Sequence, residues 1–200
     1  HEVWGTVRQS GADVAKKTAE WKTRLGPDAL AKADLPRGRD VFSRTCELCH
    51  TLYGVGGKIG PELTGSNRAD LDYLLSNVLD PSAIVGKDYT TTMVWLNDGR
   101  FVNGILKGTT DSTISLQTDT ALVVVEKTEI ESQKDSPNSL MPEGQLETLT
   151  QEEVRDLVAY LQSPQQVALR ATKLCASRLF DGKSLAGWKG DGVSWSVEQG

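Results

Sequence analysis

The sequence predicts an α+β protein in which helices flank a small antiparallel β region. Two observations carry this prediction. Apolar residues recur at spacings of three and four in several segments before residue 80 and again after residue 150, which is typical of amphipathic helices. Between about residues 88 and 134 the spacing falls to two and β-branched residues become frequent, which is typical of strands.

Length and charge limit the class of protein. Two hundred residues are enough for one medium domain with appendages. A formal net charge of -5 with no run of Lys and Arg argues against nucleic acid as a partner. No apolar stretch approaches the roughly 18 to 20 residues of a membrane span. The chain begins at His1 without Met or a signal-like segment, so we expect a processed or excised piece.

The first half of the chain is expected to be helical with one long loop. Residues 11–33 have helical spacing interrupted by Gly26-Pro27, which predicts two short helices, and residues 1–35 form an N-terminal helical arm. The next helix begins near Pro36 and runs into "TCELCH". The glycine-rich segment 51–66 is predicted to be loop. A further helix follows, with Ser66 or Asn67 as its N-cap and Pro81 after its end.

The second half begins with the strands. Turn residues separate five segments, of which the fifth is the weakest: "YTTTMVWL", "RFVNGILK", "STISLQ", "ALVVVEK" and "EIESQK". Asp98-Gly99 is a strong hairpin indicator. Residues 88–134 are therefore predicted to form a small antiparallel meander or barrel. The last helix is predicted to begin at a capping box of Thr150 and Glu153.

Cys46, Cys49 and His50 form the pattern C-x-x-C-H, which is the attachment motif of c-type haem. Two thiols one helical turn apart can each add across one porphyrin vinyl group, and the adjacent imidazole can bind the iron. A zinc site would need four ligands, and the remaining candidates, His1 and Cys175, lie at opposite ends of the chain. A thioredoxin-type dithiol expects a βαβ context. The pattern favours haem and leaves Cys175 unpaired.

The loop after the motif can orient the histidine. A ligating imidazole generally needs its second ring nitrogen bonded to an acceptor. A backbone carbonyl at Gly60-Pro61 can accept the Nδ1 proton of His50, while proline stiffens the turn. Glycines let the backbone approach a flat macrocycle closely. The alternative is a flexible surface loop.

Several stretches resemble a class I c-type cytochrome: "GRDVFSRTCELCH", "GPELTG" and "LMPEGQLETLTQEEVRDLVAYL". Residues 33–163 further resemble the haem-binding domain of the Pirellula and Verrucomicrobium type. The resemblance implies a cytochrome c helical core around one covalent haem c, with the β insertion between the haem loop and the distal-methionine segment. The cytochrome domain would span residues 36–164. Residues 165–200 would be a linker and the truncated start of a β domain that resembles a 3-keto-disaccharide hydrolase-like domain.

The resemblance also implies roles for single residues. Gly38 and Phe42 would meet Tyr160 and Leu161 where two helices cross. The cofactor-binding residues would be Cys46, Cys49, His50, Pro61 as the acceptor for the histidine, Leu63 against the haem edge, and Met141. The metal ligands would be His50 and Met141.

Two methionines compete for the distal position. Met93 lies in a predicted strand, where core packing is the ordinary role, whereas Met141 lies in irregular chain before Pro142; Met141 is therefore favoured.

Five further residues are open candidates for contact with the haem or its propionates: Trp95, Tyr53, Tyr73, Asn67 and Arg68. Arg and Tyr commonly bind such carboxylates, and an ordinary surface or core role is the alternative for each of the five.

The resemblance implies electron transfer, with no catalytic residue and no enzyme activity. The domain would relay electrons from a periplasmic dehydrogenase, possibly for carbohydrate, to a respiratory acceptor, so its partners would be redox proteins. Covalent haem attachment takes place outside the cytoplasmic membrane, so we expect a periplasmic or otherwise exported protein. The alternative function is a haem sensor or peroxidase-like enzyme in which Met141 dissociates.

Overall fold

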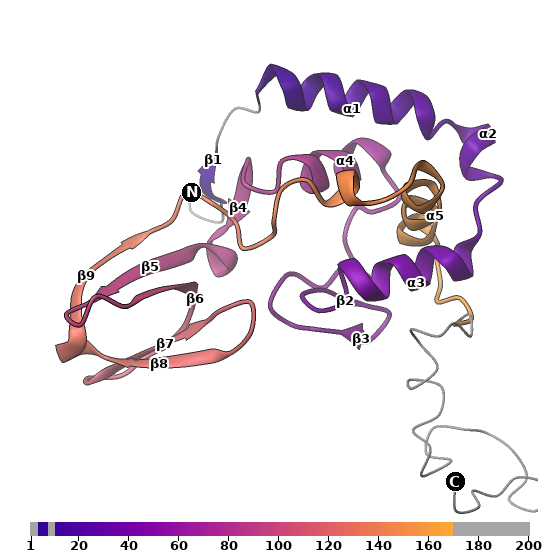
Figure 1. Cartoon of the computed structure of the whole chain (residues 1–200). Helices are drawn as coiled ribbons and strands as arrows, with labels where there is room; N and C mark the ends of the chain where they lie inside the picture. Colours follow the sequence, from indigo (N-terminus) through magenta and orange to yellow (C-terminus); the bar gives the residue numbers. More distant parts are fainter. Residues whose placement is uncertain (1–3, 8–10, 170–200) are drawn as a thin grey trace, which may run out of the picture.

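A computed structural model describes residues 4–7 and 11–169 of the chain. It is an α+β structure in which a helical unit lies beside an antiparallel β-sheet (Figure 1). The helices are α1 (Ala12–Arg24), α2 (Pro27–Leu30), α3 (Leu35–Thr45), α4 (Leu71–Leu79) and α5 (Gln151–Gln162). Within the described residues, no helix is both long and apolar enough to cross a membrane.

The crossing of α3 and α5 is the closest helix contact of the helical unit. Gly38 lies against the α5 backbone, so a Cβ added there would overlap the carbonyl of Asp156 and lie 2.8 Å from Tyr160 Cβ. Phe42 and Tyr160 pack edge to face with ring centroids 5.7 Å apart. Leu161 is buried in the same core. The predicted contact between these two helices is confirmed.

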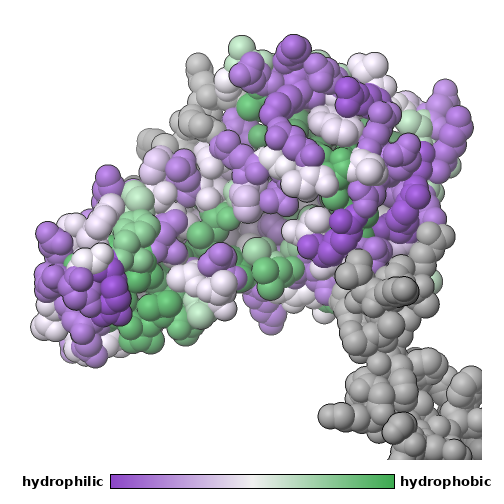
Figure 2. Space-filling model, in the orientation of Figure 1, coloured by the Kyte–Doolittle hydropathy of each residue, from purple (hydrophilic) through white to green (hydrophobic). Residues whose placement is uncertain are grey.

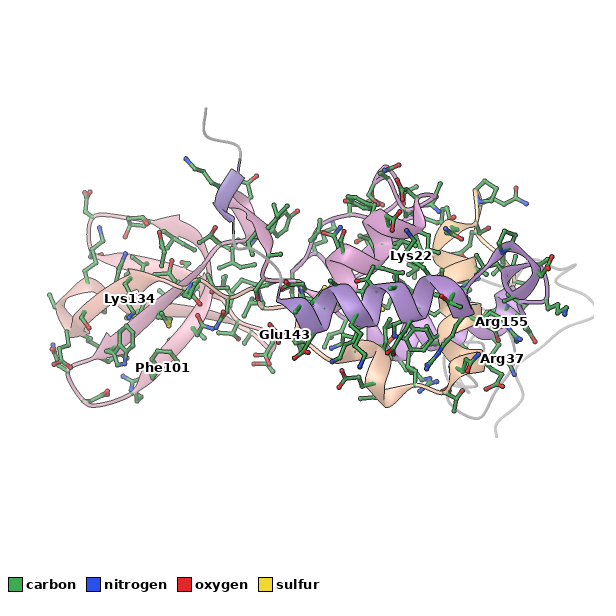
Figure 3. All side chains as sticks on the ribbon, turned by 90° about the horizontal axis from the view of Figure 1, so that it is seen from above. Lys22, Arg37, Phe101, Lys134, Glu143 and Arg155 are labelled. Carbon is green, nitrogen blue, oxygen red and sulfur yellow. The ribbon has the colours of Figure 1, made fainter. Side chains whose placement is uncertain are left out.

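A charged group is buried at the same crossing. The side chain of Asp156 is fully buried and pairs with Arg37 and with Arg155, whose Nη2 lies 2.9 Å from the carboxylate. The backbone N–H of Asp34 donates to the same carboxylate at 3.1 Å. Figure 3 shows Arg37 and Arg155 close together at one end of the helical unit. Asp156 is buried while both arginines are partly exposed, and a buried carboxylate that loses its partners is costly, so the crossing is fixed by charge as well as by packing.

The start of α4 differs from the prediction. Asp70, and neither Ser66 nor Asn67, is its N-cap: the Asp70 carboxylate accepts from the N–H of Asp72 at 2.8 Å and of Tyr73 at 3.2 Å. Ser66 instead donates to the carbonyl of Leu63 within the preceding turn. An aspartate and a serine are equally good caps by residue type, and the loop geometry decides between them.

The N-terminal arm packs on the rest of the helical unit. As predicted, it contains two helices, and α1 contacts α4. Lys22 pairs with Asp72 of α4 at 2.8 Å, and Lys17 pairs with Glu147 of the 3₁₀ helix η3 (Gln145–Thr148). A strand that was not predicted, β1 (Trp4–Val7), pairs antiparallel with β4 (Ile84–Gly86).

The segment predicted to be pure loop contains a small hairpin. Strands β2 (Thr51–Leu52) and β3 (Val55–Gly56) are joined by Tyr53 and Gly54, with φ of 53° and 78°. Positive φ at both central residues is the pattern of a type I′ turn, which favours a tight hairpin. The hairpin keeps the chain close to the end of α3.

The β-sheet contains all five predicted strands in the order β8-β7-β6-β5-β9. They are β5 (Thr91–Leu96), β6 (Phe101–Thr109), β7 (Thr113–Gln117), β8 (Leu122–Glu126) and β9 (Ile130–Asp135). Strand β9 pairs with β5, so the last strand returns to the opposite edge of the sheet.

The connection from β8 to β9 shows that the sheet is curled. A flat five-stranded sheet would hold its edge strands about 19 Å apart, at about 4.8 Å per strand. The link from Glu126 to Ile130 contains only the three residues of the 3₁₀ helix η2 (Lys127–Glu129), and its four Cα-to-Cα steps reach at most about 14 Å when fully extended. The two edge strands must therefore approach each other. Of the two predicted forms, a meander and a barrel, the sheet is closer to a barrel.

The two faces of the curled sheet differ in burial. The inner face holds an apolar core of Val94, Leu96, Ile114, Leu116 and Val125. The outer face carries exposed apolar residues, and Figure 2 shows hydrophobic side chains gathered over the sheet. On this outer face Lys134 lies over the ring of Trp95, which contacts Phe101; Figure 3 labels Phe101 and Lys134.

Candidate functional site

The end of α3 brings the two cysteines and the histidine into one turn. Cys46 is the C-cap of α3, and its N–H donates to the carbonyl of Phe42. The carbonyl of Cys46 accepts from the N–H of Cys49 at 3.1 Å and from the N–H of His50 at 2.9 Å. Both cysteines are free thiols and half-buried. The turn therefore presents two unmodified thiols and one imidazole next to each other on the chain.

His50 is oriented by the loop that follows. Its Nδ1 lies 2.9 Å from the carbonyl oxygen of Pro61, as predicted. Because a carbonyl can only accept, Nδ1 carries the proton and Nε2 keeps a lone pair for a metal. A Cβ added at Gly60 would lie 2.7 Å from His50 Cε1, so only glycine allows the backbone this close to the ring. The N–H of Gly60 also donates to the carbonyl of Cys49 at 2.8 Å.

The surroundings keep these groups neutral. Burial lowers the pKa of His50, an effect that the hydrogen bond to Pro61 partly offsets. Burial raises the pKa of Cys46, and the hydroxyl of Thr45 partly opposes this. The pKa of Cys49 is also raised, first by burial and then by the negative charge of Asp119. Reactive redox thiols have a lowered pKa, so these cysteines differ from a thioredoxin-type pair.

The donor set fits haem c better than a bare metal ion. Among the residues that the structure describes, no three His, Cys, Asp or Glu side chains are placed to hold a metal ion together. A closed zinc site needs four such ligands. Haem c makes a different demand, because each thiol bonds to a porphyrin carbon and only the imidazole binds the iron. Two neutral thiols in one turn and one oriented imidazole with a free Nε2 meet that demand.

Pro61 and Leu63 belong to the same local group as the motif. The N–H of Leu63 donates to the carbonyl of Thr51 at 2.9 Å, one residue after His50. Its half-buried side chain packs against the core of the helical unit. Five of the six predicted cofactor-binding residues, Cys46, Cys49, His50, Pro61 and Leu63, are thus held within one turn and its covering loop.

Met141, the sixth, lies on a separate segment. Its N–H donates to Ser139 Oγ, and the N–H of Ser139 donates to Ser82 Oγ at 3.1 Å. The side chain of Met141 is half-buried, and none of the contacts described for residues 11–169 joins it to His50. Met93 lies in β5 opposite Asn103 and Lys134 of the neighbouring strands. The segment of Met141 is thus anchored at its start, and its role as a ligand stays a prediction.

Arg68 and Tyr53, which were considered for haem contact, bind the end of α5. Arg68 is buried, and its guanidinium donates to the carbonyls of Leu161, at 2.5 Å, and Ser163 at the end of α5. The Tyr53 hydroxyl also donates to the carbonyl of Ser163, and the guanidinium lies 5.0 Å from the centre of the Tyr53 ring. Helix ends leave carbonyls unpaired, and a cation beside them is favourable. In this structure both residues therefore bind the carbonyls at the end of α5, and their contact with haem stays a prediction.

One charge that acts on the site was missed. Asp119, in the turn between β7 and β8, contributes to the raised pKa of Cys49 through its negative charge. Asp119 is far from the motif in the sequence, and an acidic residue in a turn has no sequence pattern that would point to this effect.

Comparisons with known proteins add no family to this picture. No protein-family model matches the chain, and a search of curated proteins found no significant match. Cys175 and the segment that resembles a hydrolase-like domain lie outside the described residues.

Proposed function

We propose that this chain is a mono-haem c-type cytochrome domain that transfers electrons. One observation carries the proposal. In a C-x-x-C-H turn with two free thiols, the imidazole of His50 has its Nδ1 bonded to the carbonyl of Pro61 and its Nε2 available. This is the arrangement that an axial haem ligand requires.

The residues of the turn have separate tasks. Cys46 and Cys49 would hold the haem: each S–H would add across one vinyl group, with sulfur bonded to one carbon and hydrogen to the other. Haem c, when bound, supplies a one-electron couple between ferric and ferrous iron. Pro61 holds His50 in one tautomer and one orientation, while the tight α3–α5 crossing at Gly38 keeps the turn fixed. A rigid ligand frame suits electron transfer because little has to move when the charge changes.

Met141 is the distal ligand in this proposal. Its segment is tied to Ser82 on one side and, through η3 and Lys17, to the N-terminal arm on the other. A thioether ligand raises the reduction potential relative to a second histidine. If His50 and Met141 both held the iron, no position would remain for a substrate, and the domain would carry electrons without acting on one.

The partners and compartment belong to the same proposal. Covalent haem attachment places the protein in the periplasm or another exported location. The resemblance to haem-binding domains next to a 3-keto-disaccharide hydrolase-like domain favours a dehydrogenase, possibly for carbohydrate, as electron donor and a respiratory protein as acceptor.

The decisive experiment tests covalent attachment. The chain is produced in a host with haem c maturation, and intact mass in denaturant and a pyridine haemochrome spectrum are measured. We expect one retained haem in the wild type and none in the Cys46→Ala, Cys49→Ala double variant. Cys175→Ala is the matched control and should retain haem. Retention by the double variant, or no haem in the wild type, contradicts the proposal.

Carbon monoxide separates electron transfer from the alternative function. The ferrous protein is exposed to carbon monoxide at neutral pH and its absorption spectrum is followed. An unchanged six-coordinate spectrum supports a bound Met141 and electron transfer. Fast and complete binding supports a sensor or a peroxidase-like enzyme in which Met141 dissociates.

A further inference from the structure

The turn between β2 and β3 contains a tyrosine in an unusual backbone conformation. Tyr53 has φ of 53°, and among residues 4–7 and 11–169 it is the one non-glycine residue with positive φ. A left-handed backbone is uncommon for such a residue, and this type of turn favours Asn, Asp or Gly there. Because a conformation of this kind persists only where the surroundings hold it, the contacts of Tyr53 indicate its task.

The backbone of Tyr53 binds the loop that contains Pro61. Its N–H donates to Thr64 Oγ1 at 2.8 Å. Two residues earlier, the carbonyl of Thr51 accepts from the N–H of Leu63 at 2.9 Å. The loop that orients the imidazole therefore lies against the β2–β3 hairpin through two hydrogen bonds that follow Pro61 directly. Figure 1 shows this hairpin beside α3.

The side chain of Tyr53 binds the end of α5. Its hydroxyl donates to the carbonyl of Ser163, and its ring meets the ring of Tyr160 edge to face with centroids 6.3 Å apart. The guanidinium of Arg68, 5.0 Å from the centre of the Tyr53 ring, donates to the same carbonyl of Ser163. The Nε of Arg68 also donates to the carbonyl of Thr64 at 3.4 Å. The hairpin, the loop and the end of α5 are thus joined at one residue.

These contacts explain why a tyrosine occupies a turn position that suits Asn or Gly. Asn would fit the backbone conformation, but its side chain is too short to reach where the Tyr53 hydroxyl reaches. Gly would make no side-chain contact at all. The turn therefore keeps a residue that is locally unfavourable, and what it gains is the connection to Ser163 and Arg68.

We propose that Tyr53 is a positioning residue for His50: its backbone holds the Pro61 loop against the imidazole, and its side chain anchors that loop to α5. The inference rests on the proposed function, in which His50 is the proximal ligand. Because α5 crosses α3 at Gly38 and α3 ends at Cys46, an anchor on α5 also fixes the loop relative to the thiols.

The expected effect on the iron ligand follows from the bond between His50 and Pro61. A hydrogen bond at Nδ1 makes a ligating imidazole more basic, and a more basic ligand favours the ferric state, which carries one more positive charge. If the loop is loosened, the bond weakens. The reduction potential should then rise, and the Nδ1 proton should exchange with water faster.

Two substitutions each remove one end of the connection with little change of shape. Thr64→Val removes the acceptor for the Tyr53 N–H, and Tyr53→Phe removes the bond to Ser163. In the ferrous haem-loaded chain, NMR should show the Nδ1 proton of His50 exchanging roughly two- to tenfold faster, the range that one hydrogen bond gives. Redox titration should show the ratio of reduced to oxidised protein rising by up to about tenfold at a fixed potential, where tenfold corresponds to about 59 mV.

Two further variants separate positioning from a general loss of stability. Thr64→Ser keeps a hydroxyl at the same place and should restore both wild-type values. Tyr89→Phe removes the same atom from another half-buried tyrosine, at the end of η1 (Lys87–Tyr89), which also has a lysine over its ring. It should leave both values unchanged. Equal changes in Tyr89→Phe, or unchanged His50 values in Thr64→Val and Tyr53→Phe, overturn the inference.

A chain that retains no haem overturns the proposed function, and the neutral tautomer of His50 then tests the positioning role by itself. His1 is the only other histidine of the chain, so ¹⁵N NMR of labelled histidine is simple to assign. Above neutral pH the wild type should carry its proton on Nδ1, because the carbonyl of Pro61 accepts from it. Thr64→Val should raise the share of the Nε2–H tautomer, and equal shares in the two chains overturn the inference as well.

Discussion

The helical unit and the curled sheet both have apolar cores, but they differ in what else they bury. The sheet core consists of Val, Leu and Ile. The helical unit also buries the charged side chains of Asp156, which pairs with two partly exposed arginines, and of Arg68 at a helix end. Buried charge is costly unless every bond is made, so it allows few alternative packings. The difference teaches that the helical unit, which carries the C-x-x-C-H turn, is fixed by buried charge, while the sheet depends on apolar packing.

The two methionines give the largest expected effect: Met93 lies in the sheet, and Met141 lies on the segment between β9 and η3. Met141→Ala should abolish the weak long-wavelength charge-transfer band of sulfur-ligated ferric haem, because the thioether is lost. Met93→Ala should keep the band, since Met93 lies within β5 of the sheet. Absorption spectra of the two ferric variants decide. A band that survives Met141→Ala, or that is lost in Met93→Ala, would contradict the assignment of Met141 as the distal ligand.

Gly38 tests how tightly the helical frame is fixed. Gly38→Val places side-chain atoms where the Asp156 carbonyl lies, and neither backbone can give way without separating α3 from α5. We expect a loss of about 3 kcal/mol or more in the free energy of unfolding, measured by urea denaturation. Gly65→Ala is the control, because a Cβ there meets nothing within 4 Å. Similar stabilities of the two variants would mean that the crossing is not close.

Local features could be predicted from the sequence, whereas contacts between distant segments could not. Local patterns gave the five strands, the capping box of Thr150 and Glu153, and the contact of His50 with Pro61. The close approach at Gly38 came from family resemblance. Contacts between distant segments were missed: the pairing of β1 with β4 and the place of β9 beside β5. These depend on how whole elements pack, which residue spacing does not encode.

Leu116 tests the stability of the sheet, again by the free energy of unfolding. Its side chain is fully buried in the inner core, so Leu116→Ala should cost about 2 to 3 kcal/mol in the free energy of unfolding. Leu106→Ala, in the adjacent strand, should cost less than about 0.5 kcal/mol because Leu106 is exposed. Intact mass should show covalent haem in both variants, since both thiols belong to the helical unit. Loss of haem in Leu116→Ala would show that the frame of the site includes the sheet core.

The capping box of α5 gives the smallest effect and depends on pH. Glu153 accepts from the N–H of Thr150 at 2.8 Å and lies beside Arg44, and these two partners lower the pKa of its carboxyl. A carboxyl whose pKa is lowered on folding stabilises the protein above its unfolded pKa, and this contribution is lost as the pH falls through the folded value. Glu153→Gln should thus cost about 0.5 to 1 kcal/mol at neutral pH and close to nothing in acid.

Urea denaturation of Glu153→Gln at neutral pH and at about pH 3 measures this difference. Glu152→Gln is the matched control, because Glu152 lies in the same first turn of α5 and shares the helix dipole without being part of the capping box. If Glu153→Gln lowers the free energy of unfolding by as much as Glu152→Gln does, or by the same amount in acid as at neutral pH, the charged cap contributes nothing beyond the helix dipole. A cost that disappears in acid assigns it to the charged cap, which holds the start of the helix that crosses α3 beside the cysteines.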